Sequence, residues 1–441
     1  MINTLKQAWK TGDLKQRLLY TLLIIIVFRI GSIIPVPFLN TEALKGFMGG
    51  MSGGSSLLQY FDTLSGGAFA QATLFALSVQ PNINASIIMQ LMGVALPYLE
   101  SLHKEGEQGR KKITAITRVL TIILGISQGF GYYMLLRNNG YAGMSIIKYT
   151  QGIEGIFAAI VIIAVFAAGT ALMMWLGERI NENGIGNGVS ILMFAGIVSR
   201  MPALLKNMGV YLYFAITDTA NFWMYYIYVP VFLVVFLGMM WLIVFMNDAE
   251  RRVPILYAKR VIGRRVFDGQ SSHLPLKIGL AGVMPIVFAG SMLMLPSMIN
   301  LFVGSNGIWK AILNAFTFGS WTYNVIYFAL IIMFAYFYVS ISYDPLEISN
   351  NLRIGGGAIP GIRAGKPTAE YLGRVLSKVI LMGALFLAFI AIFPVLFMQL
   401  IPMTGLSLSG TSIIILVGVA LETVKILQSQ TMMRIYKGFL D

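Results

Sequence analysis

Cysteine is absent from this chain, histidine occurs only at His103 and His273, and charged residues make up 11% of the sequence. Without cysteine the protein has no disulfide, no thiolate nucleophile and no metal site built on thiolates. Both histidines lie in polar loops, so the long apolar runs contain no imidazole. An ordinary soluble domain carries about 25% charged residues. The scarcity of charge therefore excludes that class of protein.

The apolar runs also lack the side chains that membrane enzymes need. No run carries a pair of carboxylates or an HExxH pattern, and Glu154 and Glu422 lie near the ends of runs. An intramembrane protease requires such a nucleophile, acid pair or metal site. Gly184, Gly186 and Gly188 resemble a phosphate-binding loop, but no Lys-Ser/Thr follows them, so they predict a tight turn. We expect neither enzymatic activity nor a cofactor.

Hydrophobic residues account for 57% of the 441 residues and gather in long runs. Runs of roughly 18 apolar residues or more predict transmembrane helices. We expect ten, at about 18–34, 61–91, 113–136, 153–176, 185–198, 222–245, 278–303, 325–342, 379–401 and 406–427. The predicted fold is an all-α polytopic membrane protein. Five helices per half is an odd number, so the second half would be inverted relative to the first around a midplane path.

The polar segments divide the chain into three regions. The amino-terminal half spans 1–246 and covers helices one to five and most of the sixth. A polar loop spans 247–277. The carboxyl-terminal half spans 278–441 and includes a second polar loop, 343–378, and a polar tail.

Positive charge is unevenly distributed along the chain. The sequence has 32 Lys and Arg against 18 Asp and Glu, and most of the Lys and Arg fall in the two tails and in alternate loops. Loops rich in Lys and Arg stay in the cytoplasm, so both termini and the loops 99–118, 247–277 and 343–378 are predicted to be cytoplasmic. The basic residues of the central loop are Arg251, Arg252, Lys259, Arg260, Arg264, Arg265 and Lys277. Such a loop is suited to a negatively charged partner.

The second apolar run is unusually polar for a membrane helix. Ser65, Gly66 and Gly67 interrupt it early, and its later polar or helix-breaking positions are Gln80, Pro81, Asn82, Asn84, Ser86 and Gln90. Amides that face lipid are costly, so these are expected to face other helices or a water-filled cavity. Two interpretations remain open: a structural kink held by interhelical hydrogen bonds, or a broken helix that lines a path.

Two classes of function are compatible with this pattern. A solute transporter with an inverted repeat would usually show buried ionisable residues, which are scarce here. Large basic loops and an apolar path favour a passive channel that closes by excluding water.

Eight strings, in order along essentially the whole chain, resemble the SecY family, which forms the channel of the bacterial protein translocase. They begin at Arg29, Ile34, Phe75, Glu105, Gly184, Tyr257, Ala281 and Ile359. They read RIG, IPVP, FALSVQPNINASIIMQL, EGEQGRKK, GIGNGVSILMFAGIV, YAKRVIGRRVFDGQSSHLPLK, AGVMPIVFA and IPGIRAGKPTAEYL. The resemblance implies a multi-pass protein of the bacterial cytoplasmic membrane. It would pass unfolded secretory proteins through a central pore between two halves and release membrane segments sideways into lipid.

The resemblance also assigns roles to particular residues. A ring of apolar side chains at the waist of the pore falls at Val79, Ile83, Met193, Ile197, Val287 and Ile415. A half-helix plug spans 57–70 and includes Leu64, Ser65, Gly66 and Gly67. A lateral gate between helices two and three and helices seven and eight includes Ile87, Gln90, Gln128 and Met284. Docking residues for a cytosolic motor or ribosome fall at Arg264, Arg265, Arg363 and Tyr436.

The implied partners are the SecA motor ATPase, the ribosome, small membrane subunits of the SecE and SecG type, signal peptides and unfolded polypeptide, all within a phospholipid bilayer. The chain departs from the common family pattern at a few positions. These are Ser78, Gln80 and Asn82 around Pro81, Met193 and Val287 in the ring, Gly279 near the side gate, and Ala364 after Arg363.

The absence of cysteine allows the predicted topology to be tested without background. A single cysteine introduced by Gly263→Cys or Ala364→Cys is expected to react with an impermeant maleimide only when the cytoplasmic face is accessible. The cysteine-free parent chain provides the blank. Labelling of either position only from the outside of intact cells would contradict the topology.

Overall fold

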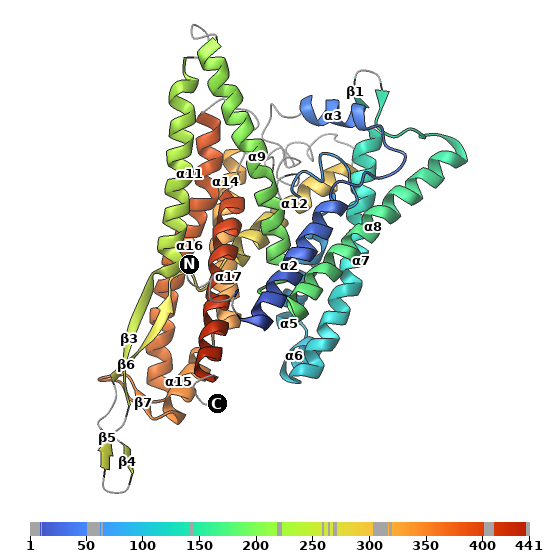
Figure 1. Cartoon of the computed structure of the whole chain (residues 1–441). Coiled ribbons are helices and arrows are strands. Elements are labelled where there is room, and N and C mark those ends of the chain that lie inside the picture. The colour runs from blue at the N-terminus through green and yellow to red at the C-terminus, as the bar shows by residue number, and fades with distance from the viewer. Residues whose placement is uncertain are drawn as a thin grey trace.

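The computed structural model describes Trp9 and residues 11–437, apart from 51–61, 63–64, 139, 142–143, 218–222, 258–259, 263–264, 268–270, 303–315, 317–319 and 401–409. Ten helices of this part occupy the ten predicted membrane positions (Figure 1). They are α2 (Gly12–Gly31), α5 (Gln80–Ala95), α7 (Glu107–Asn138), α8 (Gly152–Asn183), α9 (Gly188–Thr217), α11 (Tyr225–Asp248), α12 (Met284–Phe302), α14 (Trp321–Ser342), α16 (Lys366–Leu400) and α17 (Gly410–Lys437).

Seven helices of the described part are long and apolar enough to cross a membrane: α7, α8, α9, α11, α14, α16 and α17. The other three occupy the predicted first, second and seventh positions. At 1.5 Å per residue, the 16 residues of α5 reach about 24 Å, which is short of a hydrocarbon core of about 30 Å. The largely buried turns of residues 65–79 directly precede α5 and contact α7 and α8.

The helices form two groups of five with the same packing plan. In the first group α5 packs on α7, α7 on α8, and α8 on α9; in the second, α12 packs on α14, α14 on α16, and α16 on α17. Likewise α2 contacts α8 and α9, as α11 contacts α16 and α17. The two groups run in opposite directions, since α2 rises in Figure 1 and α11 descends. By these contacts α11 belongs with the second five helices.

Two helices differ in extent from the prediction. The fifth apolar run was expected to be short, at 185–198, but α9 continues to Thr217 with Pro202 inside it. Its polar Ser199 and Arg200 interrupt the hydropathy pattern without ending the helix. The second run was expected to be one interrupted crossing at 61–91, whereas helix α5 begins only at Gln80. Pro81 lies in its first turn, where a missing backbone N–H costs nothing.

The polar loops contain short elements that the sequence did not predict. The loop 247–277 is an antiparallel ribbon in which β3 (Glu250–Tyr257) pairs with β6 (Ser271–Lys277). Strand β3 also pairs with β7 (Gly357–Ala358), which joins the ribbon to the second polar loop and its helix α15 (Pro345–Ile354). A small hairpin of β4 (Arg260–Ile262) and β5 (Arg265–Phe267) extends from the ribbon.

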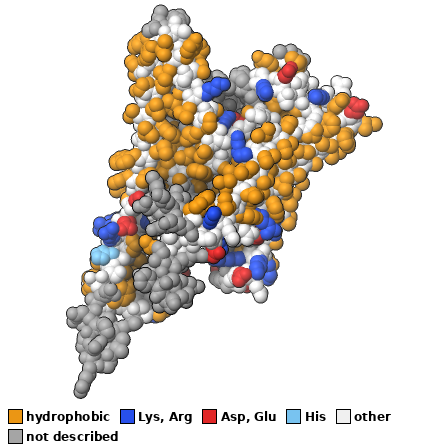
Figure 2. All heavy atoms as spheres, in the orientation of Figure 1, with side chains coloured by type: hydrophobic (Ala, Val, Ile, Leu, Met, Phe, Trp, Pro, Cys, Tyr) orange, Lys and Arg blue, Asp and Glu red, His pale blue; other side chains and the backbone are white. Residues whose placement is uncertain are grey.

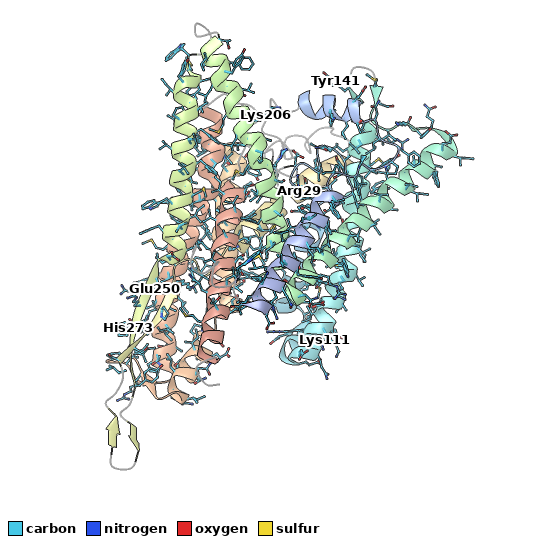
Figure 3. The ribbon with its side chains drawn as sticks, in the orientation of Figure 1. Arg29, Lys111, Tyr141, Lys206, Glu250 and His273 are labelled. Atoms are coloured by element: carbon cyan, nitrogen blue, oxygen red, sulfur yellow. The ribbon has the colours of Figure 1, made fainter. Side chains whose placement is uncertain are left out.

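The polar elements lie at opposite ends of the helices. Figure 1 shows α6 (Pro97–Lys104), the ribbon, α15 and the carboxyl terminus at one end. Helix α3 (Thr41–Gly50) and the β1–β2 hairpin (Gly140–Tyr141, Met144–Ser145) lie at the other end. Figure 3 accordingly places Lys111, Glu250 and His273 at one end and Tyr141 and Lys206 at the other. The loops that the charge pattern assigns to one side therefore do share a side.

Between these ends the surface is apolar. Figure 2 shows hydrophobic side chains over the outer helices, with charged side chains gathered mainly toward the two ends. Large residues there are widely exposed, including Trp241 at 67% and Ile153 at 87%. A soluble protein rarely exposes contiguous apolar patches of this extent, so this is a surface made for lipid or for other membrane subunits.

The turn between α8 and α9 depends on a close glycine contact. A Cβ added at Gly188 would lie 1.9 Å from the carbonyl oxygen of Gly177, whereas a Cβ at Gly238 would meet nothing within 4 Å. Gly188→Ala should therefore lower stability by about 1–3 kcal/mol through overpacking, and Gly238→Ala should leave it unchanged. Thermal unfolding of the purified protein in detergent measures the difference, and equal midpoints would contradict this packing.

Candidate functional site

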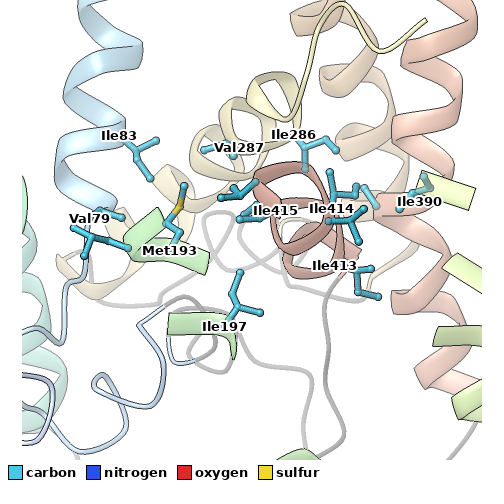
Figure 4. Close-up of a cluster of buried hydrophobic side chains, with 14 of the residues drawn as sticks. Val79, Ile83, Met193, Ile197, Ile286, Val287, Ile390, Ile413, Ile414 and Ile415 are labelled. Atoms are coloured by element: carbon cyan, nitrogen blue, oxygen red, sulfur yellow. The ribbon is translucent and has the colours of Figure 1, made fainter. Parts of the chain in front are cut away.

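Six apolar side chains gather at the middle of the molecule, and we call them the waist cluster: Val79, Ile83, Met193, Ile197, Val287 and Ile415. These are the six residues that the sequence analysis assigned to a ring. All are buried, with exposed fractions of 8% or less. In Figure 4, Val79 and Ile83 lie on one side, Val287 and Ile415 on the other, and Met193 between them.

The waist cluster comes from four helices at the contact between the two groups of five. Val79 precedes the first residue of α5, and its carbonyl accepts a bond from the Ile83 N–H at 3.0 Å, which sets the two side chains one turn apart. Met193 and Ile197 stand four residues apart on α9 and share a face. Val287 belongs to α12 and Ile415 to α17. Helix α5 contacts α12 and α9 contacts α17, so the cluster joins the groups.

The side chains of the waist cluster can exclude water and ions. Its side chains offer no charge and no hydrogen-bonding group, so an ion placed among them would lose its hydration without replacement. They also bind no passing group tightly, since dispersion contacts are individually weak. Such a layer can separate two aqueous spaces and still yield to a polypeptide.

The predicted plug segment packs directly beside this cluster. Of its assigned residues, Leu64 lies outside the described part, whereas Ser65, Gly66 and Gly67 are described. The Gly66 carbonyl accepts a bond from Ser199 Oγ at 3.4 Å, and a Cβ on Gly66 would lie 2.8 Å from the Gly196 carbonyl oxygen. Gly66 also has a positive φ of 68°, which favours glycine. Close approach to α9 therefore requires a glycine here.

The chain that follows the plug is held among helices of the first group. Tyr132 of α7 donates its hydroxyl to the Phe69 carbonyl at 2.6 Å, and the two rings stack at 4.4 Å. On α8, a Cβ at Gly169 would lie 1.9 Å from the Leu74 carbonyl oxygen. Residues 65–79 thus form a largely buried, non-helical connection, and neighbouring helices bond its Gly66 and Phe69 carbonyls.

The polar residues of α5 make bonds between helices. Gln80 Nε2 donates to Ser291 Oγ of α12 at 3.4 Å, and Thr121 Oγ1 of α7 donates to Asn82 Oδ1 at 3.4 Å. Of the two interpretations of this run, interhelical bonding accounts for these two amides. Asn84 differs, because its Oδ1 is buried without a hydrogen-bond partner.

The four residues assigned to a lateral gate lie on α5, α7 and α12. Ile87 is buried in the same hydrophobic core as the waist cluster, and Met284 packs against that core from the first turn of α12. Gln90 and Gln128 are half-buried. Helix α12 contacts both α5 and α7, so these residues flank the line where the two groups meet on this side.

The four residues assigned to docking are less completely described. Arg264 lies outside the described residues, and Arg265 opens strand β5 of the small hairpin. Arg363 is exposed in the second polar loop, and its carbonyl accepts a bond from Thr368 Oγ1 at 2.8 Å. Tyr436 lies in the last turn of α17. All three described positions belong to elements at the end that carries the ribbon (Figure 1).

One feature of the site was not found from the sequence. Asp62, at the start of the plug segment, forms an ion pair with Arg200 of α9. The two residues are 138 positions apart, so no spacing rule connects them. An available signal was their position, since each is a charged residue within or beside a predicted apolar run and such charges usually pair.

Comparisons with known proteins agree with this architecture. The SecY family model matches residues 73–424. A protein translocase subunit SecY from Streptomyces scabiei is 42% identical over 451 residues, with 100% of both chains covered. The Mycobacterium bovis protein of the same name is 38% identical over 458 residues, again with 100% of both covered.

Solved structures show the same fold at low sequence identity. A SecY structure described by the role of its plug domain in stabilising the closed translocation channel aligns with a TM-score of 0.65 at 18% identity, covering 94% of this chain and 92% of that one. The yeast Ssh1 complex, solved on the yeast ribosome, aligns at 0.60 and 13% identity, covering 96% and 89%. With its full-length relatives, its matching family model and its two five-helix groups, the chain belongs to the SecY family of protein translocase subunits.

Proposed function

We propose that the waist cluster is the constriction of a protein-conducting channel, through which unfolded secretory proteins cross the bacterial cytoplasmic membrane. The observation that carries this proposal is the meeting of six apolar side chains from four helices at the contact between the two five-helix groups. Membership of a translocase family favours a channel over the solute transporter that the sequence left open.

An apolar constriction suits a passage for polypeptides of any sequence. At rest it excludes water and ions by dewetting. During transport its aliphatic side chains move aside without breaking any fixed hydrogen bond, and Met193 adds a flexible, unbranched side chain. In this proposal the described part of the plug segment, Asp62 and residues 65–70, covers the waist cluster from the side opposite the ribbon.

Membrane segments would leave sideways between α5 and α7 on one hand and α12 and α14 on the other. Support comes from the contacts described between α5 and α12, which are one long hydrogen bond and apolar packing. The bond from Gln80 to Ser291 is 3.4 Å long, and Ile87 and Met284 contribute only apolar contacts. Contacts of this kind can open and reform without leaving a buried charge unpaired.

The end that carries the ribbon, α15 and the carboxyl terminus would face the cytosol, because its loops hold most of the Lys and Arg. There Arg264, Arg265, Arg363 and Tyr436 would bind a SecA-type motor or a ribosome, either of which could drive transport. The ribosome-bound state of the structurally similar yeast complex supports the second partner. SecE- and SecG-like subunits would cover part of the exposed apolar surface.

A polar side chain in the waist cluster should open the seal. Ile83→Asn is expected to raise resting ion conductance and to allow passage of substrates with poor signal sequences, because an amide holds water in the constriction. Adding Ile415→Asn should increase the conductance further. Planar-bilayer recording of the purified complex measures both.

Ordinary helix packing predicts a different result for the same variants. A buried polar group would then lower stability by about 1–3 kcal/mol without creating a leak. The matched control is Ile162→Asn, which places the same change in α8, where Ile162 is equally buried but belongs to another core cluster. Wild-type conductance of intact Ile83→Asn and Ile415→Asn proteins would reject the constriction.

Charge reversal at Arg363 should impair docking. Arg363→Glu is expected to slow translocation severalfold while the protein remains inserted and folded, because the exposed arginine would contact an acidic partner. Attraction to anionic lipid alone is worth only about 1 kcal/mol per charge. Arg137→Glu, an exposed arginine at the opposite end of the molecule, is the control. Unchanged transport by Arg363→Glu would remove this residue from the docking surface.

A further inference from the structure

The plug segment carries a charged side chain that is buried against a membrane helix. Asp62 is 7% exposed, and its carboxylate is paired with the guanidinium of Arg200. Arg200 lies on α9, one turn beyond Ile197 of the waist cluster. A buried carboxylate is costly unless it is paired, so Asp62 depends on Arg200, whose own side chain is 32% exposed.

Asp62 also organises the segment that follows it. Its Oδ1 accepts a bond from the Ala70 N–H at 2.8 Å, and its carbonyl oxygen accepts from the Gly67 N–H at 2.9 Å and from Ser65 Oγ at 3.2 Å. These bonds tie Asp62 to Ser65, Gly67 and Ala70. An interaction that holds Asp62 against α9 therefore also holds Ser65, Gly67 and Ala70 near α9.

The remaining contacts of this turn with α9 are weak by comparison. The bond from Ser199 Oγ to the Gly66 carbonyl is 3.4 Å long, and Gly66 and Gly67 present no side chains. Among the described residues, Arg200 and Asp62 thus supply the strongest link between the plug segment and α9. This link joins two parts that must separate whenever a polypeptide passes.

We propose that the Asp62–Arg200 ion pair is a latch that keeps the plug closed over the waist cluster and breaks at each opening. This latch rests on the proposed function, since it regulates the same constriction. It makes the closed state depend on two charges, in addition to the apolar seal. Arg200 is accordingly a positioning residue, which acts through the plug and does not itself contact the waist.

The two sides of the latch should respond differently to neutralisation. Asp62→Asn removes the charge but keeps an oxygen for the Ala70 N–H, so the plug can still dock without a buried anion. Arg200→Gln leaves the Asp62 carboxylate buried without its cation, which favours the undocked plug. Arg200→Lys retains a positive charge and should keep the plug closed.

Plug position is measured by adding Ser65→Cys, because Ser65 is fully buried and the parent chain has no cysteine. The full complex is reconstituted in lipid vesicles and treated with a membrane-impermeant maleimide from the side opposite the ribbon. Arg200→Gln should raise the labelling rate about tenfold or more. The increase should be smaller for Asp62→Asn and absent for Arg200→Lys. Resting conductance of the same variants without the cysteine should follow the same order.

The control is another ion pair of this chain. Lys425 Nζ and Asp248 Oδ1 lie 3.0 Å apart and join α17 to the end of α11, away from the plug. Asp248→Asn should leave both labelling and conductance unchanged. A general effect of removing an ion pair would instead appear in this variant as well.

The outcomes separate the latch from the constriction. If Arg200→Gln and Asp62→Asn label and conduct like the parent while Ile83→Asn leaks, the latch is wrong and the constriction stands. If Ile83→Asn does not leak but Arg200→Gln exposes Ser65→Cys, the plug is latched and the constriction fails. If Arg200→Gln merely lowers the yield of folded complex, and the folded fraction labels at the parent rate, the pair is structural and the latch is overturned.

Discussion

The layer of apolar side chains where the two five-helix groups meet is the contact on which the rest of the structure depends. Each group is held together by its own helix packing, and among the described residues the groups meet where α12 contacts α5 and α7 and where α9 contacts α11 and α17. The waist cluster fills that contact with Val, Ile and Met side chains. Because these aliphatic and thioether side chains form no hydrogen-bonded network with one another, they can separate and repack without breaking one.

Several polar groups near the waist cluster are bonded to a neighbour on another segment, whereas Asn84 Oδ1 is buried without a hydrogen-bond partner. The Tyr132 hydroxyl is bonded to the Phe69 carbonyl, Gln80 to Ser291, and Asp62 to Arg200. At membrane depth an unbonded polar group costs several kcal/mol. These bonds therefore help to position the non-helical chain of residues 65–79.

The end of the molecule that carries the ribbon is stabilised by backbone pairing between strands. The β3–β6 ribbon and β7 join two loops that lie far apart in the sequence, and they extend α11 and α15 beyond the helical body. Backbone pairing can stabilise such a projection in water, where an isolated loop would be poorly ordered. Arg251 and Arg252 are thereby held on the paired strand β3.

The sequence by itself predicted the apolar helices and their order, and it grouped the basic loops that lie at one end of the molecule. Through the family resemblance it also assigned to a pore ring six residues that the structure brings together in one core, and their role as a ring stays a prediction. Hydropathy and charge are local properties, and the family strings assign Val79 and Val287 to the ring without any knowledge of packing. Only the tertiary structure decided that Asp62 meets Arg200, that α9 continues beyond Pro202, and that the central loop is a ribbon. Those features depend on which distant segments become neighbours. The free energy of a contact between two segments depends on both of them, so neither segment predicts it alone.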